Sequence, residues 1–348
     1  MEKVTVSETP KVPVDSSTAQ NGVHEEKPKT SRRKKDPTGD IMFSAFLVAY
    51  AALFVASFQD RIPSHPWEIM TLNEHLAWAA WMIEYWWIPV VLSGAYLVLT
   101  FGTQKYLADK KGYDKELRMP LAYWSVLLAV FSVAGSLRTV PAMLKITANR
   151  GVMHVVCGDT RYEWLHGTPA GFWTFWFCMS KIPELIDTAF IVLRKKELIT
   201  LHWYHHFTVM LFCWQAWASC TLNGLIFAAM NLTVHGVMYT FYALAALGYR
   251  PNRFAMFITM GQISQMIVGT AVTAYVTLDK VLWHPIKEVD LSLKIPTWFT
   301  LKDAQPDGGE CFVSSGNALA GLVMYGSYLL FFVHFFIKAY CLPGGKGE

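Results

Sequence analysis

Eight apolar stretches follow one another along the chain, separated by more polar connections. Each approaches the ~20 residues that a helix needs to cross a hydrocarbon core of about 30 Å. A backbone in lipid must satisfy its own hydrogen bonds, so runs of this kind are expected to be helices. The pattern therefore predicts an all-α polytopic membrane protein. The stretches are 41–59, 80–103, 119–142, 170–192, 199–218, 222–247, 254–277 and 317–340.

The connections between these stretches predict their orientation. Lys and Arg gather in 104–118, 193–198 and 248–253. The alternate connections are long or poor in basic residues: 60–79 with only Arg61, 143–169, 219–221 and 278–316. Basic connections tend to stay in the cytosol, so the first set is predicted to be cytosolic and the alternate set lumenal. Eight spans then leave both termini in the cytosol.

The same pattern predicts the domain boundaries. Residues 1–39 are polar and rich in Lys and Arg, which is typical of a disordered cytosolic tail. Residues 40–340 form the transmembrane domain, and 341–348 form a second cytosolic tail. Within the domain, 41–59 is interpreted as an extra N-terminal span, the alternative being a segment that lies in the membrane interface.

The composition agrees with this fold class and excludes others. Of 348 residues, 53% are hydrophobic and 16% are charged, against about 25% charged in a typical soluble domain. A net charge of only +4, with the basic residues scattered or in the tail, gives no indication of nucleic-acid binding. No CxxC pair and no glycine-rich phosphate-binding motif occurs, so structural zinc sites and nucleotide-driven transport lack their usual motifs.

Three imidazoles lie close together in the stretch 199–218. On a helix, His202, His205 and His206 fall within a ~100° arc. Ionisable groups are expensive inside a membrane span and mark function more often than structure. The cluster therefore indicates either metal binding or an imidazole nucleophile, with an interfacial cluster as the structural alternative.

A second ionisable group occupies one face of the stretch 170–192. Lys181, Glu184 and Asp187 fall within a ~120° arc. A carboxylate can accept a hydrogen bond from an imidazole N–H and so fix its tautomer and raise its basicity. These residues are interpreted as a buried network that orients the imidazoles, the alternative being a charge-paired structural stripe.

Two more polar faces complete the candidate site. The stretch 222–247 places Asn231, His235, Tyr239 and Tyr242 on one stripe, which favours a functional role over a structural one. The stretch 254–277 carries two glutamines at i, i+3 spacing, for which hydrogen bonding between helices is an equal alternative. These glutamines are Gln262 and Gln265.

The number of histidines bears on the choice between metal and nucleophile. A His-x-x-His-His box also occurs in membrane di-iron desaturases and hydroxylases, which need many imidazole ligands. The chain has 11 His, of which only His235 and His334 could join the box inside the membrane. This is too few for two metals, although one metal held by His202, His206 and His235 stays open. A nucleophilic imidazole explains the neighbouring charged residues better, so no metal is expected.

Taken together, these motifs closely resemble those of the ELO family of very-long-chain fatty acid elongases, which are membrane 3-ketoacyl-CoA synthases. The likeness runs from about Trp81 to Tyr340 and is greatest to the branch that elongates saturated and monounsaturated acyl chains. The matching residues are Lys181, Glu184, Asp187 and Thr188; His202, His205 and His206; Met230, Asn231, His235, Met238 and Tyr239; and Thr259, Gln262 and Gln265.

The resemblance implies a fold and an activity. Seven family-type transmembrane helices would surround an acyl tunnel, and 41–59 would be an additional span. The enzyme would be an acyltransferase that condenses a long-chain acyl-CoA with malonyl-CoA, giving 3-ketoacyl-CoA, CO₂ and CoA, with no cofactor beyond these substrates. The alternatives are a histidine-box metalloenzyme and a non-enzymatic receptor or transporter. No internal repeat of the kind found in many transporters is seen.

Roles for individual residues follow from that activity. His205 is expected to be acylated, since a neutral imidazole is a good nucleophile near pH 7. His202 and His235 would donate to the enolate oxygen of decarboxylated malonyl-CoA. The remaining expected catalytic residues are His206, Lys181, Glu184, Asp187, Asn231 and Gln262. The expected substrate-binding residues are Arg194, Lys195, Lys196, Tyr239, Tyr242, Gln265, Arg250 and Arg253.

Two further expectations concern the lumenal side of the protein. Cys157 and Cys311 lie in the two long lumenal connections, where the oxidising compartment and the resemblance both favour a disulfide between them. Four bulky residues at the lumenal span ends could close the tunnel, an equal alternative being ordinary aromatic residues of the membrane interface. These residues are Trp173, Trp176, Trp214 and Trp217.

The resemblance also implies a location and partners. It places the protein in the endoplasmic reticulum membrane, although the C-terminus carries no dilysine retrieval signal. The expected partners are acyl-CoA, malonyl-CoA, the lipid bilayer, other enzymes of an elongation cycle and a second copy of the chain, but no nucleic acid.

Overall fold

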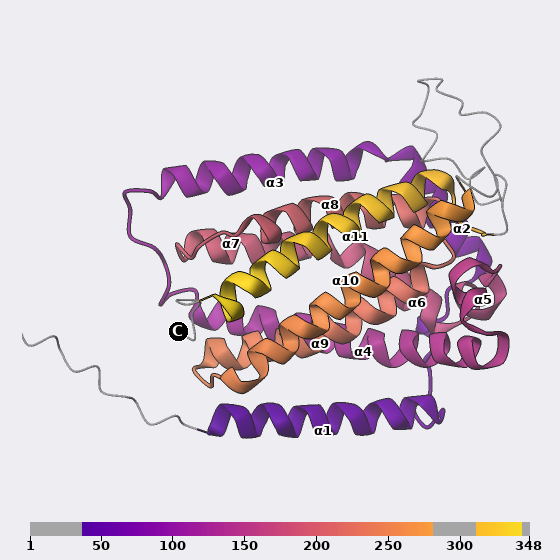
Figure 1. Cartoon of the computed structure of the whole chain (residues 1–348), viewed down its shortest axis with the longest axis horizontal. Helices are drawn as coiled ribbons and strands as arrows, with labels where there is room; N and C mark the ends of the chain where they lie inside the picture. Colours follow the sequence, from indigo (N-terminus) through magenta and orange to yellow (C-terminus); the bar gives the residue numbers. More distant parts are fainter. Residues whose placement is uncertain (1–36, 281–310, 343–348) are drawn as a thin grey trace, which may run out of the picture. The chain divides into compact units, whose positions relative to one another are not determined.

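The computed structural model describes residues 37–280 and 311–342, and every regular element in these ranges is helical. The longer helices run side by side in a bundle, with α1 and α3 on opposite sides of the others (Figure 1). The α-helices are α1 (Thr38–Phe58), α2 (Leu72–Glu84), α3 (Trp87–Tyr106), α4 (Arg118–Arg150), α5 (Val152–Cys157), α6 (Pro169–Ser180), α7 (Ile186–Leu193), α8 (Thr200–Ala218), α9 (Gly224–Leu247), α10 (Ala255–Leu278) and α11 (Ser315–Phe336). The short helical turns are η1 (Pro66–Glu68), η2 (Arg161–Leu165), η3 (Pro183–Leu185), η4 (Asn252–Phe254) and η8 (Ile337–Cys341).

The prediction of an all-α polytopic membrane protein is confirmed. Among the described residues, six helices are long and apolar enough to cross a membrane. The helix α8 is long enough but less apolar, because it carries the histidine box, and α6 and α7 are each too short. The number of spans and the domain boundaries stay predictions. The tail to residue 36, the segment 281–310 and residues 343–348 lie outside the described residues. The six helices are Thr38–Phe58, Trp87–Tyr106, Arg118–Arg150, Gly224–Leu247, Asn252–Leu278 and Ser315–Cys341.

Proline breaks two of the stretches that were predicted to be continuous helices. The stretch 80–103 is divided at Tyr85–Trp86 between α2 and α3, and 170–192 is divided after Ser180 between α6 and α7. A proline ring clashes with the carbonyl four residues earlier and offers no N–H. Pro89 stands four residues after Tyr85, and Pro183 follows the end of α6 by three residues. The second break carries the chain through Lys181 in the middle of the bundle.

A third proline lies inside α4 without ending it. Pro141 leaves the carbonyl of Leu137 without its usual N–H partner, and the hydroxyl of Ser57 on α1 donates to that carbonyl. In membrane helices, neighbouring Ser or Thr side chains commonly satisfy the backbone carbonyl that a proline leaves without a donor. Tyr50 of α1 and Ser136 of α4 share a second hydrogen bond of 2.6 Å between these two helices. The N-terminal helix is therefore joined to the bundle by polar contacts, although its outer face is apolar and exposed.

Among the described helices, α4 and α9 share the most extensive packing. Gly135 of α4 is pressed against Leu232 of α9 and Trp173 of α6, so that a Cβ at this position would lie 3.0 Å from Leu232 Cδ1. Small residues at such crossings allow membrane helices to approach closely, where van der Waals packing and hydrogen bonds hold them together. This contact fixes the position of α9, which carries Asn231 and His235.

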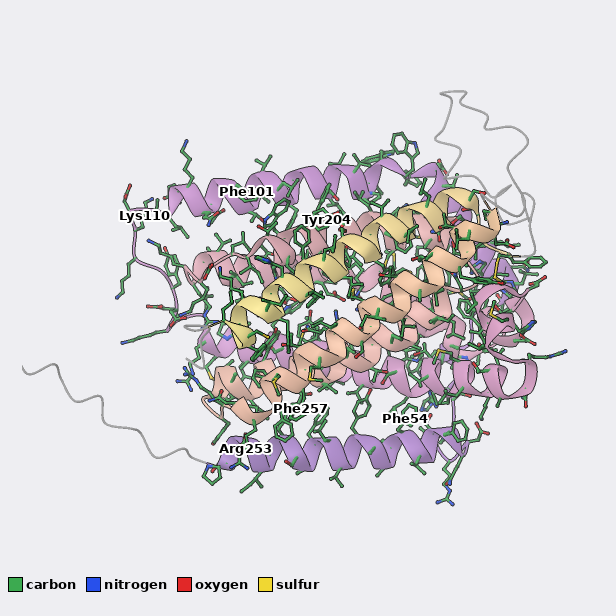
Figure 2. All side chains as sticks on the ribbon, viewed as in Figure 1. Phe54, Phe101, Lys110, Tyr204, Arg253 and Phe257 are labelled. Carbon is green, nitrogen blue, oxygen red and sulfur yellow. A yellow bond between two sulfur atoms is a disulfide. The ribbon has the colours of Figure 1, made fainter. Side chains whose placement is uncertain are left out.

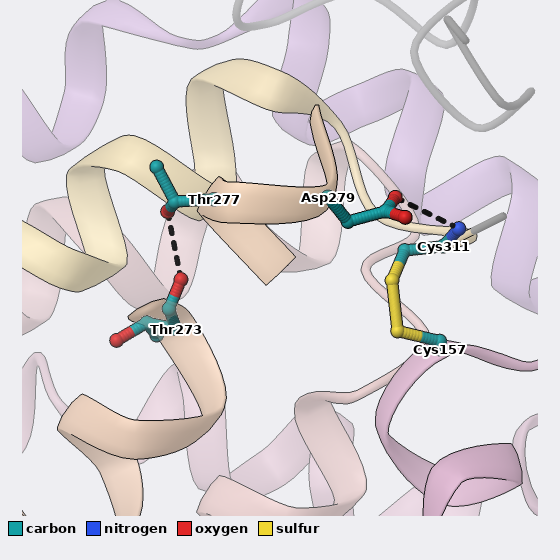
Figure 3. Close-up of a disulfide and its surroundings, with 5 residues drawn as sticks. All are labelled: Cys157, Thr273, Thr277, Asp279 and Cys311. Carbon is teal, nitrogen blue, oxygen red and sulfur yellow. Dashed lines mark hydrogen bonds between the residues drawn. A yellow bond between two sulfur atoms is a disulfide. The ribbon is translucent and has the colours of Figure 1, made fainter. Parts of the chain in front are cut away.

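Two sets of contacts hold the loops at the end of the bundle where α2 and α5 lie. A disulfide joins Cys157 at the end of α5 to Cys311 before α11, and Asp279 accepts a hydrogen bond of 3.3 Å from the backbone N–H of Cys311 (Figure 3). The second set surrounds Glu68 of η1. Burial alone would raise the pKa of this carboxyl, but hydrogen bonds from Arg138 at 2.9 Å and Trp173 at 2.8 Å lower it.

Candidate active site

A large cavity with polar walls opens between α7, α8, α9 and α10, and we call it the polar cavity. It encloses about 1810 Å³, counted with the solvent at its mouth. The Lys195 and Arg253 side chains do not line it, while most of the other residues singled out from the sequence do. These lining residues are Asp187, Arg194, Lys196, His202, His205, His206, Asn231, His235, Tyr239, Tyr242, Arg250, Gln262 and Gln265.

The histidine box projects from the first two turns of α8. The rings of His202 and His206 lie 4.4 Å apart, as expected for residues at i, i+4. His202 Nε2 lies 3.0 Å from the hydroxyl of Thr188 on α7, which in turn lies 2.9 Å from the hydroxyl of Tyr96 on α3. This chain of hydrogen bonds sets the orientation of the His202 ring from two neighbouring helices.

His205 is held differently. Its backbone carbonyl accepts a hydrogen bond of 3.2 Å from Tyr328 of α11, and the two rings lie 4.7 Å apart. The ring itself is less constrained, since its Nδ1 is buried and has no hydrogen-bond partner in the described part of the chain. The imidazole therefore retains a nitrogen that no protein group has engaged.

A buried chain of hydrogen bonds leads from α6 and η3 to His235. The ammonium of Lys181 donates to both oxygens of Glu184, at 2.8 and 3.0 Å, and to Oδ1 of Asn231 at 3.1 Å. An ammonium can only donate, so the contact fixes the Asn231 amide, whose Nδ2 then donates to His235 Nε2 at 3.2 Å. The proton of a neutral His235 consequently resides on Nδ1. Lys181 and Glu184 are 2% and 3% exposed, so they lie behind the cavity wall and act through Asn231.

Asp187 has a separate set of partners. Its Oδ2 accepts a hydrogen bond of 2.6 Å from the hydroxyl of Tyr239, and its Oδ1 accepts one of 2.7 Å from the indole N–H of Trp124 on α4. The expectation that Asp187 orients a member of the histidine box finds no such contact here. Instead it fixes Tyr239, whose ring lies 5.3 Å from that of His235. Nothing in the sequence singles out Trp124, since tryptophan is common in membrane proteins.

Basic residues surround the mouth of the polar cavity. Arg194 and Lys196 both pair with Asp114, at 2.8 and 3.2 Å. Burial raises the pKa of Asp114, but the hydrogen bonds and charges of these two cations together outweigh it and lower the pKa below its ordinary value. Arg250 also lines the cavity. An anionic group entering here would meet three cations, of which two are shared with one carboxylate.

The two expected substrate-binding residues outside the polar cavity have other partners. Lys195 donates to the backbone carbonyls of Ala108 and Lys110, at 2.8 and 2.9 Å, so its ammonium turns toward the loop that follows α3. Arg253 is 81% exposed and lies 3.3 Å from Asp40 of α1 (Figure 2). Lys195 and Lys196 are consecutive residues after the end of α7, and consecutive side chains point in different directions. This explains why Lys196 lines the cavity and Lys195 does not.

A second cavity, the apolar chamber, continues from the histidine box between α6, α8, α9 and α11. Its space between atoms amounts to about 730 Å³, counted with the solvent at its opening. Along α8 its lining residues recur at intervals of three and four, so one face of this helix forms a wall from His205 to Trp217. His205, Asn231, Gln265 and Met266 line both cavities. The chamber therefore begins where the polar cavity ends, with His205 on the shared wall.

Loops as well as helices close the far end of the chamber. Trp164 and Leu165 of η2, His75 of α2 and Cys220 after α8 all line it. His75 Nε2 lies 3.2 Å from Cys220 Sγ. Burial, and after it the neighbouring His166, lowers the pKa of His75 to about 4, so its ring is neutral at pH 7. These loop residues were not identified from the sequence, because the hydrophobic pattern places them in connections.

Of the four tryptophans considered as a tunnel closure, only Trp217 lines the chamber. The indole N–H of Trp214 donates to the carbonyl of Met82 at 2.8 Å, and that of Trp173 donates to Glu68. Trp176 is 44% exposed on the outer face of α6. The expectation is thus wrong for three of them, because helical spacing turns their side chains into other packing surfaces.

The described residues contain no group of three or more His, Cys, Asp or Glu side chains arranged to hold a metal ion. What the site does combine is an unengaged imidazole, two networks that fix neighbouring polar groups, a cationic mouth and a long apolar chamber. This arrangement is suited to holding a molecule with a charged end and an apolar end, with its reactive group at His205.

Comparison with known proteins identifies the family. The ELO: GNS1/SUR4 family model matches residues 81–348, which is most of the chain. The chain belongs to the ELO family. The matched region begins in α2, so α1 lies outside it.

Curated relatives extend this result. The chain is 41% identical over 261 residues to the rat protein named "Very long chain fatty acid elongase 6", covering 75% of this chain and 87% of the relative. It is 40% identical over 269 residues to the chicken protein of the same name, covering 77% and 89%. It is 40% identical over 229 residues to "Fatty acid elongase 2" of Trypanosoma cruzi, covering 65% and 75%. Membership of this family supports a role in fatty acid elongation.

Proposed function

We propose that this ELO protein is a very-long-chain 3-oxoacyl-CoA synthase, which condenses a long-chain acyl-CoA with malonyl-CoA through an acyl-histidine intermediate. The observation that carries the proposal is the position of His205 on the wall shared by the polar cavity and the apolar chamber. An acyl chain in the chamber and a CoA moiety in the polar cavity would bring the thioester to this imidazole.

The CoA moiety is proposed to dock at the cationic mouth. Arg194, Lys196 and Arg250 line it, and guanidinium and ammonium groups bind phosphate through charge-assisted hydrogen bonds. Tyr239, Tyr242 and Gln265 line the passage toward His205 and would contact the pantetheine arm, which offers amide donors and acceptors.

The first step transfers the acyl group to His205. A nitrogen lone pair of the neutral imidazole attacks the thioester carbonyl, and the C–S bond of the resulting tetrahedral species breaks. The imidazole N–H proton leaves with the thiolate, so the products are acyl-His205 and free CoA. An acyl-imidazole remains reactive, which is the two-step logic of covalent catalysis. The buried Nδ1 without a partner supports this role.

The second step forms the new carbon–carbon bond. Malonyl-CoA loses CO₂, and the enolate carbon attacks the acyl carbonyl, which returns the electron pair of the C–N bond to His205. The enolate oxygen needs donors placed in advance. His235 is suited to this role, because the hydrogen bond from Asn231 leaves its proton on Nδ1. His202 and Gln262 also line the cavity within the same group of helices.

The apolar chamber favours a particular class of acyl chain. Its walls are mostly apolar and its far end is closed by loops, which suits extended rather than strongly bent chains. We propose saturated or monounsaturated acyl-CoA of about 12 to 18 carbons as the preferred substrates, in a chamber that crosses part of a ~30 Å hydrocarbon core. Faster elongation of a 20-carbon polyunsaturated acyl-CoA than of palmitoyl-CoA, when both compete for one enzyme sample, would contradict this preference.

The same proposal includes a location and an orientation. The protein would reside in the endoplasmic reticulum membrane with both termini and the cationic mouth in the cytosol, where acyl-CoA and malonyl-CoA are available. The helix ends around the mouth carry Arg194, Lys196 and Arg250, in agreement with the positive-inside rule. A glycosylation site introduced near residue 20 should then remain unmodified.

The activity itself is tested with purified full-length protein, palmitoyl-CoA and radiolabelled malonyl-CoA. The proposal expects label in a 3-ketoacyl-CoA longer than the substrate by two carbons. It expects His205→Ala to abolish this product. His334→Ala is the matched control, since this α11 imidazole is exposed and lines neither cavity. No labelled 3-keto product from the unmodified protein would overturn the proposal.

A further inference from the structure

The apolar chamber contains three buried polar atoms that its chemistry as an acyl site does not explain. His75 Nδ1, Thr174 Oγ1 and Trp217 Nε1 are all inaccessible to solvent and have no hydrogen-bond partner within residues 37–280 and 311–342. All three residues line the chamber. Burying a donor or acceptor without a partner costs free energy, and such groups are uncommon in native structures. Each of the three atoms therefore calls for an explanation, such as a hydrogen bond to a bound molecule.

These residues lie near one another at the closed end. The rings of His75 and Trp217 are 4.7 Å apart. The ring of Phe175, which adjoins Thr174 on α6, lies 5.2 Å from that of Trp217. They come from α2, α6 and α8, three elements that meet at this end of the bundle. His75 and Trp217 are therefore adjacent on the chamber wall, and Thr174 lies on the turn of α6 that packs against Trp217.

Their chemistry is complementary to a hydroxyl group. The indole N–H of Trp217 can only donate, a threonine hydroxyl both donates and accepts, and one nitrogen of a neutral imidazole does either according to its tautomer. The other ring nitrogen of His75 is already engaged with Cys220 Sγ at 3.2 Å. A bound hydroxyl could accept from Trp217 and donate to His75 or Thr174, so that both of its hydrogen-bonding functions are satisfied.

The distance from His205 suits the far end of a long acyl chain. Twelve residues separate His205 from Trp217 on α8, which at about 1.5 Å per residue is about 18 Å. A C–C bond of about 1.5 Å at an angle near 111° advances an extended chain by about 1.25 Å per carbon, so about 14 to 15 carbons cover this span. The last carbons of a 16-carbon chain attached at His205 would thus reach the three polar atoms.

We propose that the closed end of the apolar chamber binds a terminal hydroxyl, so that ω-hydroxyacyl-CoA of about 16 carbons is a substrate class of this enzyme. The inference rests on the proposed condensing activity, because it assigns the chamber to the acyl chain. It adds a polar subsite formed by His75, Thr174 and Trp217 to a tunnel that is otherwise apolar.

The test compares two substrates that differ only at the chain end. Full-length enzyme is given malonyl-CoA with either palmitoyl-CoA or 16-hydroxypalmitoyl-CoA, and kcat/KM is measured for each. The proposal expects the hydroxylated chain to be used within about tenfold of palmitoyl-CoA, because the wall replaces the hydrogen bonds that the hydroxyl loses on leaving water. Rejection of 16-hydroxypalmitoyl-CoA by more than about 100-fold, with palmitoyl-CoA elongated normally, would overturn it.

Two variants remove the polar atoms, Thr174→Val with little change in shape and Trp217→Phe with some loss of volume. Trp217→Phe removes the indole N–H, and Thr174→Val replaces a hydroxyl with a methyl group. Each is expected to lower the ratio of kcat/KM for the hydroxylated chain to that for palmitoyl-CoA, by about tenfold singly and more in combination. Phe212→Leu is the matched control, since it removes volume from the same chamber but no polar atom, and it should leave the ratio unchanged.

The ratio also separates this inference from the proposed function. A ratio that neither Trp217→Phe nor Thr174→Val changes would mean that the three atoms bind no substrate hydroxyl, water being their partner instead, and the inference would be wrong while elongation stands. Failure of both substrates to yield a 3-ketoacyl-CoA would instead refute the proposed function, and the inference with it.

Discussion

The polar cavity and the apolar chamber share His205 but satisfy their polar groups in opposite ways. In the polar cavity, buried Lys181 and Glu184 hold Asn231 in one network, and Asp187 holds Tyr239 in a second. In the chamber, three polar atoms of the wall, His75 Nδ1, Thr174 Oγ1 and Trp217 Nε1, have no partner among the described residues. The first arrangement fixes catalytic groups before any ligand arrives, whereas the second leaves hydrogen bonds for a ligand to complete.

The difference follows from what each region must do. Groups that stabilise charge in a transition state act best when they are already oriented, so that no reorganisation is needed during the reaction. A chamber for an acyl chain needs mainly apolar area and a defined length. Breaking the polar network should therefore impair catalysis, whereas changes in the chamber should alter which substrate is used.

The largest effect is expected at the buried ion pair. Lys181→Met leaves Glu184 charged and without its cation inside the bundle, and loss of one partner of a buried pair typically costs about 3–5 kcal/mol. It also releases Asn231, so elongation should be lost. Thermal unfolding in detergent and the labelled malonyl-CoA assay report the two effects separately.

An exposed pair provides the control for this prediction. Lys145 and Asp60 lie 2.6 Å apart, but their side chains are 38% and 79% exposed. Lys145→Met should cost at most about 1 kcal/mol and leave elongation intact. Equal destabilisation by the two lysine variants would show that burial of the Lys181–Glu184 pair does not increase the cost of losing its cation.

A smaller effect is expected from Asp187→Asn. The amide keeps one acceptor for Tyr239 or Trp124 but presents an NH₂ group to the other donor, so one hydrogen bond of this network is lost. We expect kcat to fall roughly 30-fold with little change in KM, as for a group that acts mainly in the transition state. Trp124→Phe removes a single donor while keeping both carboxylate oxygens, so it should cost less; a larger loss than for Asp187→Asn would contradict this network.

A substitution in the chamber should change selectivity instead of chemistry. Ala216 lines the chamber on the α8 face between His205 and its closed end. Ala216→Phe should exclude long chains, so that the ratio of kcat/KM for palmitoyl-CoA to that for a 12-carbon acyl-CoA falls by about tenfold. An equal loss for both chain lengths would indicate that the residue affects the histidine box and not the length of the chamber.

The smallest effect is expected at the mouth of the polar cavity. Asp114 pairs with Arg194 and Lys196, so Asp114→Asn would release both cations for CoA phosphates and lower KM about two- to fivefold, less so at high salt. The lowered pKa of Asp114 keeps its carboxylate charged throughout the assay range. The change in KM should therefore be the same at pH 6 and pH 8, and a change at only one of them would point to another group.

The sequence predicted the polar cavity far better than the chamber. Charged and imidazole groups inside apolar helices are costly, so Lys181, Glu184, His205 and His235 could be recognised individually, and helical periodicity grouped them by face. The pairing of Asp187 with Trp124 could not be predicted, because it depends on how α4 packs against α7, which no local pattern encodes.

The chamber was harder to predict because its closed end is formed by connections. His75, Trp164 and Cys220 lie where the hydrophobic pattern predicts loops, and the conformation of a loop is set by the helices that it joins. The helix breaks at Tyr85 and Ser180 were missed for a related reason. A proline can lie inside an intact membrane helix, as Pro141 does in α4, or next to a break, as Pro89 and Pro183 do. The outcome depends on whether a neighbouring side chain can donate to the carbonyl that the proline leaves without an N–H partner.

The central claim is that His205 carries the acyl group, and incubation with acyl-CoA alone tests it most directly. Without malonyl-CoA, the account predicts release of free CoA and a palmitoyl mass increase that peptide mapping places on His205. His235→Ala should still be acylated but form no 3-ketoacyl-CoA, and His205→Ala should show neither acylation nor product. If the enzyme releases no CoA until malonyl-CoA is added, and no acylated His205 can be trapped, the two-step account is wrong.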